Sequence, residues 1–209
     1  MTKDQVRQII LEVGIVPVVR ASSAEQAIAI SHAICAGGIP IVEVTMTVPG
    51  AVEVIRQLVE SMCSRVLVGA GTVLDAESAQ QCLDAGAQFL VSPGFDAETV
   101  ALARKSETLM MAGALTPTEV ITAWRAGSDF VKIFPCGNVG GPAYIKALKA
   151  ALSQIPMVPT GGVSLATAAQ FLAAGASALG VGGDLVSADM QAITAAARQY
   201  AALIRSRPS

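Results

Sequence analysis

A lysine and a glutamate each interrupt an otherwise apolar run of this sequence. Lys132 lies within the run 130–134, and Glu43 lies within the run 39–45. Runs this short, apolar and rich in β-branched residues are typical of strands buried on both faces. A buried lysine is rare without a partner, and dry surroundings favour the neutral amine. Because a neutral amine attacks carbonyl carbons and forms a Schiff base, Lys132 is a candidate catalytic nucleophile.

Glu43 adds a second reactive group. A carboxylate inside a protein is costly unless it is paired or used. Beside an amine nucleophile, it can act as a general acid and base. Taken alone, these residues leave structural alternatives open. The amine of Lys132 could reach water from a strand end, and Glu43 could form a buried ion pair with Lys132 or Arg20 for stability only.

Apolar runs and alanine-rich helical patterns alternate along the chain. The runs predict about eight strands, at residues 15–19, 41–45, 66–70, 89–92, 108–112, 130–134, 157–159 and 178–181. The patterns between them predict helices at 23–36, 50–63, 76–85, 97–106, 117–126, 142–151, 165–174 and 189–205, with a further N-terminal helix at 3–13. Strict alternation of strand and helix predicts a parallel sheet.

We therefore expect an α/β fold, a compact (β/α)8 TIM barrel with an extra N-terminal helix, as one domain over residues 1–209. An open doubly wound sheet is the alternative. The pair Ala-Gly recurs where helices should end, at 36–37, 85–86, 126–127 and 174–175. We expect each of these glycines to supply a left-handed helix cap.

Active sites of such barrels lie at the C-terminal ends of the strands. The residues expected there, which are polar or form turns, are Arg20, Thr47, Thr72, Pro93 and Thr160. Glycine pairs follow the seventh and eighth strands, where barrels often bind a phosphate with backbone N–H groups. These pairs, Gly161-Gly162 and Gly182-Gly183, predict a phosphate site, although tight turns also use such pairs.

The composition argues against several classes of function. Hydrophobic residues make up 53% of the chain and charged residues 14%, and the net charge is −2 without a basic block. We therefore expect no nucleic-acid partner. No apolar stretch is long enough for a membrane span, and the N-terminus carries no signal-peptide core. We expect a cytoplasmic protein that does not bind membranes.

Metal and redox sites are not expected either. The cysteines Cys35, Cys63, Cys82 and Cys136 form no Cys-x-x-Cys pair, and we expect buried reduced thiols. His32 is the single histidine, and it lies in a predicted helix among alanines and isoleucines. Scattered Asp and Glu residues without further histidines do not make the ligand set of a tight metal cage.

Five motifs occur in an order that is similar to one known family. They are Val42-Glu43-Val44-Thr45, Val68-Gly69-Ala70-Gly71-Thr72-Val73, Val91-Ser92-Pro93-Gly94, Phe130-Val131-Lys132-Ile133-Phe134-Pro135 and Val158-Pro159-Thr160-Gly161-Gly162-Val163. From about residue 13 to 186, the chain resembles the 2-keto-3-deoxy-6-phosphogluconate (KDPG) aldolase / 4-hydroxy-2-oxoglutarate (KHG) aldolase family. The resemblance implies a class I aldolase on a (β/α)8 barrel, usually a homotrimer, with no metal or organic cofactor. It also implies cleavage of KDPG to pyruvate and glyceraldehyde 3-phosphate.

The resemblance further implies roles for single residues. Lys132 is similar to the Schiff-base lysine of the family, and Glu43 to its proton shuttle. Thr72 and Pro93 are similar to residues around the carboxylate end of the substrate. Residues implied at the anionic groups are Arg20, Gly161, Gly162 and Gly183.

Two positions depart from the family pattern. Thr47 stands where many members have arginine, and Gly183 where many have serine. The anionic groups of the substrate would then depend on Arg20 and on backbone donors. Thr160 resembles the gluconate branch of the family, because the related galactonate aldolases tend to have an apolar residue there.

Several other functions remain open. The same chemistry could act on 4-hydroxy-2-oxoglutarate or on the galactonate epimer of KDPG. A metal-free phosphosugar isomerase or epimerase would use Glu43 as a base and form no imine. A non-catalytic phosphate-binding barrel is a third possibility, and the expense of two unused buried charges argues against it.

Overall fold

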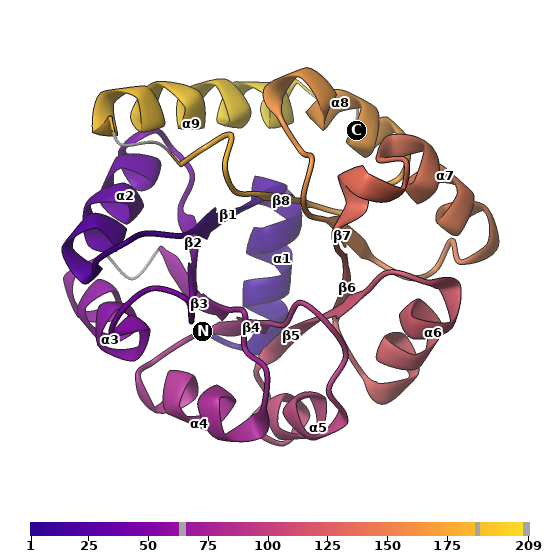
Figure 1. Cartoon of the computed structure of the whole chain (residues 1–209), viewed down its shortest axis with the longest axis horizontal. Coiled ribbons are helices and arrows are strands. Elements are labelled where there is room, and N and C mark those ends of the chain that lie inside the picture. The colour runs from indigo at the N-terminus through magenta and orange to yellow at the C-terminus, as the bar shows by residue number, and fades with distance from the viewer. Residues whose placement is uncertain (63–65, 187–188, 207–209) are drawn as a thin grey trace.

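The computed structural model describes residues 1–62, 66–186 and 189–206. Eight parallel strands form one sheet in the order β7-β6-β5-β4-β3-β2-β1-β8. An isolated parallel bridge between Thr160 and Gly180 joins β7 to β8, so the sheet curls into a barrel. Figure 1 looks along this barrel and shows the helices arranged around the strands. The predicted (β/α)8 barrel is confirmed, and the alternative of an open sheet is wrong.

The elements alternate from the first strand to the last helix. The strands are β1 (Ile15–Val19), β2 (Ile41–Thr45), β3 (Leu67–Gly71), β4 (Phe89–Val91), β5 (Leu109–Ala114), β6 (Phe130–Ile133), β7 (Met157–Pro159) and β8 (Leu179–Val181). The helices are α1 (Lys3–Val13), α2 (Ala24–Ala36), α3 (Ala51–Ser61), α4 (Ala76–Asp84), α5 (Ala97–Lys105), α6 (Pro117–Ala126), α7 (Pro142–Ala151), α8 (Leu165–Ala173) and α9 (Met190–Arg205), with a 3-10 turn η1 (Cys136–Val139). Every residue of each strand is buried, as a parallel sheet covered by helices requires.

The observed boundaries differ slightly from the predicted ones. β3 begins and ends one residue later than the run 66–70, and β5 continues to Ala114. Both strands end in small residues, which an apolar pattern does not separate from a loop. The sequence pattern does not predict η1. The end of the predicted helix 50–63, at Cys63, lies outside the described residues.

Glycines end helices as predicted, with one correction. Gly86, Gly127 and Gly175 have φ values of 94°, 101° and 99°, in the left-handed region. Gly37 does not, because its φ is −79°, and Gly38 takes the left-handed conformation instead, at φ 94°. Gly37 is required for packing, since a Cβ there would lie 2.3 Å from the Cβ of an alanine in α9.

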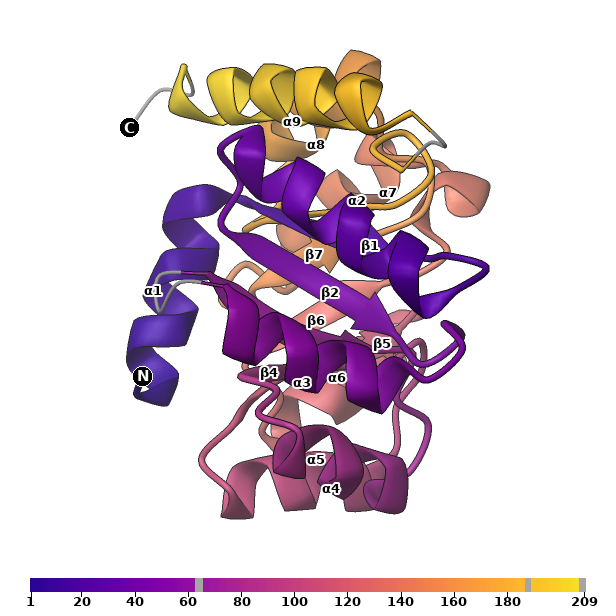
Figure 2. The same ribbon diagram turned by 90° about the vertical axis from the view of Figure 1, so that its left-hand side faces the viewer.

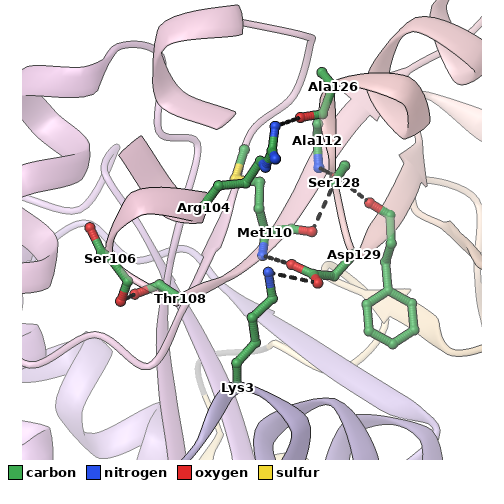
Figure 3. Close-up of polar contacts among 10 residues, drawn as sticks. Lys3, Arg104, Ser106, Thr108, Met110, Ala112, Ala126, Ser128 and Asp129 are labelled. Atoms are coloured by element: carbon green, nitrogen blue, oxygen red, sulfur yellow. Dashed lines mark hydrogen bonds and ion pairs between the residues drawn. The ribbon is translucent and has the colours of Figure 1, made fainter. Parts of the chain in front are cut away.

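Helix α1 covers the N-terminal end of the barrel, opposite the tips of the strand arrows (Figure 2). Its Lys3 Nζ lies 2.9 Å from Asp129 Oδ1, and Asp129 Oδ2 accepts the N–H of Met110 at 2.9 Å (Figure 3). These contacts tie α1 to the start of β6, the strand that carries Lys132. The predicted extra N-terminal helix is confirmed. It supports the strand that carries Lys132 from the N-terminal end of the barrel.

The cysteines are mostly as expected. Cys82 and Cys136 are buried, and burial raises the pKa of each thiol to about 11, so both stay protonated. Cys35 is only half-buried, because it lies in the last turn of α2. Cys63 lies outside the described residues.

Within residues 1–62, 66–186 and 189–206, no helix is long and apolar enough to cross a membrane. In the same residues, no group of three or more His, Cys, Asp or Glu side chains is placed to hold a metal ion.

Candidate active site

Glu43 and Lys132 lie inside the barrel on strands that are far apart in the sequence. Glu43 is the middle residue of β2 and is 2% exposed, and Lys132 lies on β6 and is 4% exposed. The Lys132 Nζ is 3.9 Å from the Glu43 Oε1. At this distance the charges attract, but no direct hydrogen bond forms. The barrel thus brings together the two residues that the sequence predicts as a nucleophile and a proton carrier.

The surroundings of Glu43 suit proton transfer. Burial raises the pKa of the Glu43 carboxyl, and the positive charges of Lys132 and Arg20 oppose that rise. Its Oε1 is buried and has no hydrogen-bond partner among the described residues. A carboxyl group with a raised pKa and an unoccupied oxygen is suited to accept and release a proton.

Two glycines lie on the strands that flank this pair, Gly71 on β3 next to β2 and Gly113 on β5 next to β6. A Cβ at Gly71 would lie 2.0 Å from Glu43 Oε1, so only glycine leaves space for the carboxylate. Gly113 pairs with Lys132 across β5 and β6. A Cβ at Gly113 would lie 2.1 Å from the carbonyl carbon of Pro93. The predicted site residue Pro93 therefore packs directly over the strand next to the lysine.

Thr72 follows Gly71 at the tip of β3. Its φ is 58°, which puts a β-branched residue in the left-handed region. That conformation is strained for threonine and tends to occur at functional sites. Thr72 is half-buried and comes directly after the glycine that faces Glu43. The structure thus places this predicted residue next in the chain to the glycine that faces the Glu43 carboxylate.

Thr47 is held at the tip of β2 by a pair of hydroxyl groups. The hydroxyl oxygens of Thr45 and Thr47 are 2.8 Å apart, and the Thr45 hydroxyl also lies 3.0 Å from the carbonyl oxygen of Val19, to which it donates. Thr45 pairs with Gly71 across β2 and β3. A neutral hydroxyl is therefore fixed where many members of the resembling family carry a positive charge.

A cavity of about 370 Å³ opens at the ends of β1, β7 and β8. The predicted residues that line it are Arg20, Thr160, Gly161, Gly162, Gly182 and Gly183. Thr47, Thr72 and Pro93 are not among its lining residues, and neither are Glu43 and Lys132. The predicted phosphate residues therefore share one cavity, while Thr47, Thr72 and Pro93 lie outside its lining.

The two glycine pairs of this cavity differ in what the backbone requires. Gly161 and Gly162 have φ values of 84° and 80°, and a Cβ at Gly162 would lie 2.7 Å from the Cα of Gly137. The fold itself thus needs glycine at both positions. Beside Gly182 the nearest atom to an added Cβ is 3.9 Å away, and beside Gly183 there is none within 4 Å. Open space at these two positions suits a ligand.

Phe134 is a site residue that the sequence analysis missed. Lys132 Nζ lies 5.4 Å from the centroid of the Phe134 ring, a cation–π distance, and Phe134 also lines the cavity. It therefore connects the buried pair with the cavity. The signal in the sequence is the two-residue spacing from Lys132, because such residues share one face of an extended chain. An aromatic in an apolar run is easily taken for core alone.

A comparison with protein-family models decides the family. The model described as "KDPG and KHG aldolase" matches residues 6–199. The chain belongs to this aldolase family. As an aldolase, it is a lyase, and the recognition from the sequence motifs is confirmed.

The curated relatives of this aldolase match it over most of their length. A 2-dehydro-3-deoxy-phosphogluconate aldolase of Treponema pallidum is 36% identical over 193 residues, which are 90% of this chain and 91% of the relative. A 2-dehydro-3-deoxy-6-phosphogalactonate aldolase of Escherichia coli is 34% identical and covers 92% and 93% of the two chains. The chain is therefore similar to a phosphogluconate aldolase and to a phosphogalactonate aldolase at nearly equal sequence identity.

Solved structures agree with the barrel of this aldolase. The KDPG aldolase of Zymomonas mobilis with 3-phosphoglycerate has a TM-score of 0.86 at 30% identity, and the match covers 96% of each chain. A KDPG aldolase of Legionella pneumophila, with pyruvate captured as a covalent carbinolamine intermediate, has a TM-score of 0.84 at 27% identity over 91% of this chain and 95% of that chain.

Proposed function

We propose that this aldolase cleaves KDPG to pyruvate and glyceraldehyde 3-phosphate through an imine on Lys132. The observation that carries the proposal is the buried pair of Lys132 and Glu43, 3.9 Å apart inside the barrel of an aldolase family member. A nucleophilic amine and a carboxyl group with a raised pKa are the two groups that this reaction needs.

The first half of the reaction forms the electron sink. The Lys132 amine adds to the C2 carbonyl carbon of the substrate and gives a carbinolamine. Loss of water then gives a protonated imine. Phe134, with its ring centroid 5.4 Å from Nζ, offers an electron-rich face to this positive charge. The cationic imine performs the electron withdrawal that a metal ion supplies in other aldolases.

The second half moves protons through Glu43. The carboxylate, through a water molecule, takes the proton of the C4 hydroxyl, and the C3–C4 bond breaks. Its electron pair goes into the imine and leaves an enamine, while glyceraldehyde 3-phosphate departs. Glu43 then returns a proton to C3 of the enamine. Hydrolysis of the resulting imine releases pyruvate and restores the amine of Lys132.

The ends of the substrate would lie in different parts of the site. Thr72 and Pro93 would contact the carboxylate end, beside Gly71 and Gly113. The phosphate would enter the cavity lined by Arg20 and both glycine pairs. Because Thr47 carries no charge, the anionic groups would depend on Arg20 and on backbone N–H groups. No metal or organic cofactor is needed for these steps.

We further propose that the enzyme is a homotrimer and acts in the cytoplasm. The family resemblance supports the trimer. A cube-shaped protein cage designed by fusing symmetric oligomeric domains also matches this chain, with a TM-score of 0.87 at 32% identity over 92% of the chain and 72% of the cage chain. The free thiols of Cys82 and Cys136 suit a reducing compartment.

Pyruvate release from three substrates tests the proposed reaction. KDPG, its galactonate epimer and 4-hydroxy-2-oxoglutarate are compared by kcat/KM in an assay coupled to lactate dehydrogenase. We expect the highest value for KDPG, because Thr160 follows the gluconate pattern. A higher kcat/KM for one of the other two compounds would identify that compound as the preferred substrate. Failure of all three to release pyruvate would favour an isomerase or epimerase.

A further inference from the structure

Asp184 is a charged residue of the cavity that the proposed reaction does not use. It lies in the loop after β8, is exposed, and lines the same cavity as Arg20 and the glycine pairs. The proposed substrate carries its phosphate in this cavity. A carboxylate there would repel a phosphate, since like charges at short range are unfavourable.

Two hydrogen bonds hold the Asp184 carboxylate in place. Its Oδ2 accepts the N–H of Leu165 at 3.1 Å and the O–H of Tyr200 at 2.6 Å. Leu165 is the first residue of α8. The first N–H groups of a helix have no partner within the helix, and they favour a negative charge. The carboxylate of Asp184 therefore occupies the Leu165 N–H. This donor lies at the start of α8, where another anion could use it.

The neighbouring donor of α8 is also engaged. The Ser164 N–H donates to Thr167 Oγ1 at 3.0 Å, so this donor is satisfied by the chain itself. A phosphate can gain the Leu165 N–H only if it displaces the carboxylate of Asp184.

The charge of Asp184 is not neutralised by a cation. Among the described residues, no lysine or arginine lies within ion-pair distance of it, although Arg20 lines the same cavity. Burial and the bond to Asp184 raise the pKa of Tyr200 far above its ordinary value, so the phenol remains a donor. Asp184 is thus a fixed negative charge supported by neutral donors.

We propose that Asp184 determines specificity at the phosphate end of the site. Its carboxylate competes with the phosphate of the substrate for the N-terminus of α8, and it lowers the preference for phosphorylated over unphosphorylated aldehydes. The inference rests on the proposed aldolase function, and it concerns the end of the substrate that takes no part in imine formation.

The variant Asp184→Asn tests the competition. Asparagine keeps the shape and an acceptor oxygen for Leu165 and Tyr200 but loses the charge. The reaction is run as aldol addition of pyruvate to D-glyceraldehyde 3-phosphate and, separately, to D-glyceraldehyde. We expect the ratio of kcat/KM for the two aldehydes to rise by roughly tenfold, the order expected for one unit charge removed near a dianion.

The matched control is Asp75→Asn. Asp75 also caps a helix, by accepting the Ser78 N–H at 2.7 Å, and it is exposed but does not line the cavity. The variant Asp75→Asn should leave the ratio of kcat/KM for the two aldehydes unchanged. Tyr200→Phe gives a second test, because it keeps the ring and removes the donor that holds Asp184. That variant should raise the ratio less than Asp184→Asn does.

The outcomes separate this inference from the proposed function. Borohydride trapping with pyruvate alone does not involve the phosphate end, so it is measured on every variant. Absence of trapping in the wild type counts against the proposed function. Normal trapping with an unchanged or lower aldehyde ratio in both Asp184→Asn and Tyr200→Phe overturns the role of Asp184 and leaves the aldolase intact.

Discussion

Glu43 and Lys132 lie together inside the barrel, where they are 2% and 4% exposed. The Nζ–Oε1 distance of 3.9 Å is too long for a hydrogen bond, so neither group fully satisfies the other. Burial raises the pKa of Glu43 despite the nearby lysine. Such an arrangement is unfavourable for stability alone, and it keeps both groups available for chemistry.

The variant Glu43→Gln separates imine formation from proton transfer. Glutamine has the shape of the glutamate but cannot carry a proton, so we expect pyruvate trapping to persist while kcat falls by about 10²–10⁴. Stopped-flow and steady-state measurements of cleavage give kcat. Glu98→Gln, an exposed change on α5, serves as the control and should not alter kcat. A normal kcat in Glu43→Gln would refute its role.

The raised pKa of Glu43 also predicts how stability depends on pH. Between the ordinary value of 4.5 and the raised folded value, the folded protein keeps a proton that the unfolded chain has released. The contribution of Glu43 to the stability of the wild type therefore falls as the pH rises through this window. Glu43→Gln has no such proton, so its stability relative to wild type should increase with pH above 4.5.

Urea denaturation at fixed protein concentration and several pH values measures this difference. The measured quantity is the free energy of unfolding of Glu43→Gln minus that of the wild type. If this difference stays constant or decreases as the pH rises through the window, the result contradicts a raised pKa for Glu43.

The reactive residues were visible in the sequence because they break a pattern. A charge within an apolar run, as at Glu43 and Lys132, is costly unless it is paired or used, so it stands out. Phe134 and Asp184 break no pattern, because an aromatic fits a core strand and an acidic residue fits a loop. Only the three-dimensional structure shows that Phe134 lies over the amine and that Asp184 faces the cavity.

At the scale of elements, Gly71 on β3 makes room for the side chain of Glu43, the proposed proton carrier. We expect Gly71→Ala to abolish most turnover, since its Cβ would lie 2.0 Å from Glu43 Oε1 and displace the carboxylate. Gly37→Ala is the matched control, because its Cβ would meet α9 far from the site. It should lower the melting temperature and leave kcat of the folded enzyme unchanged. Equal losses of kcat in both variants would argue against a positioning role for Gly71.

The alternation of elements was predictable, and the details of their ends were not. Apolar runs separated by alanine-rich segments predict strands and helices, because parallel strands are buried on both faces. The exchange of roles between Gly37 and Gly38 depends on how α2 packs against α9, which no local pattern reveals. The end of β5 at Ala114 was not predictable either, because a small residue fits both a strand and a loop.

At the scale of the molecule, α1 and the ring of helices enclose the barrel from one end and the sides, which leaves the strand tips for the substrate (Figure 2). The proposed trimer would assemble three such barrels. Light scattering coupled to gel filtration should give three times the chain mass of 21.3 kDa. A mass of one or two chains would contradict the trimer without affecting the chemistry proposed for each barrel.

We also expect residues 1–209 to behave as one domain. The lysine, the glutamate and the cavity lie on strands from both halves of the chain, so the site exists only when the whole ring has closed. The order of the elements predicts this dependence, but the closing contact between Thr160 and Gly180 does not follow from the sequence.

The central claim is that Lys132 forms the imine. The most direct measurement is reduction with borohydride in the presence of pyruvate, followed by peptide mass spectrometry. We predict a reduced pyruvyl adduct on Lys132, its loss together with turnover in Lys132→Ala, and no effect of Lys146→Ala, a change of an exposed lysine on α7. An adduct on Lys146 or Lys149, or no adduct at all, would contradict the assignment of Lys132 as the nucleophile.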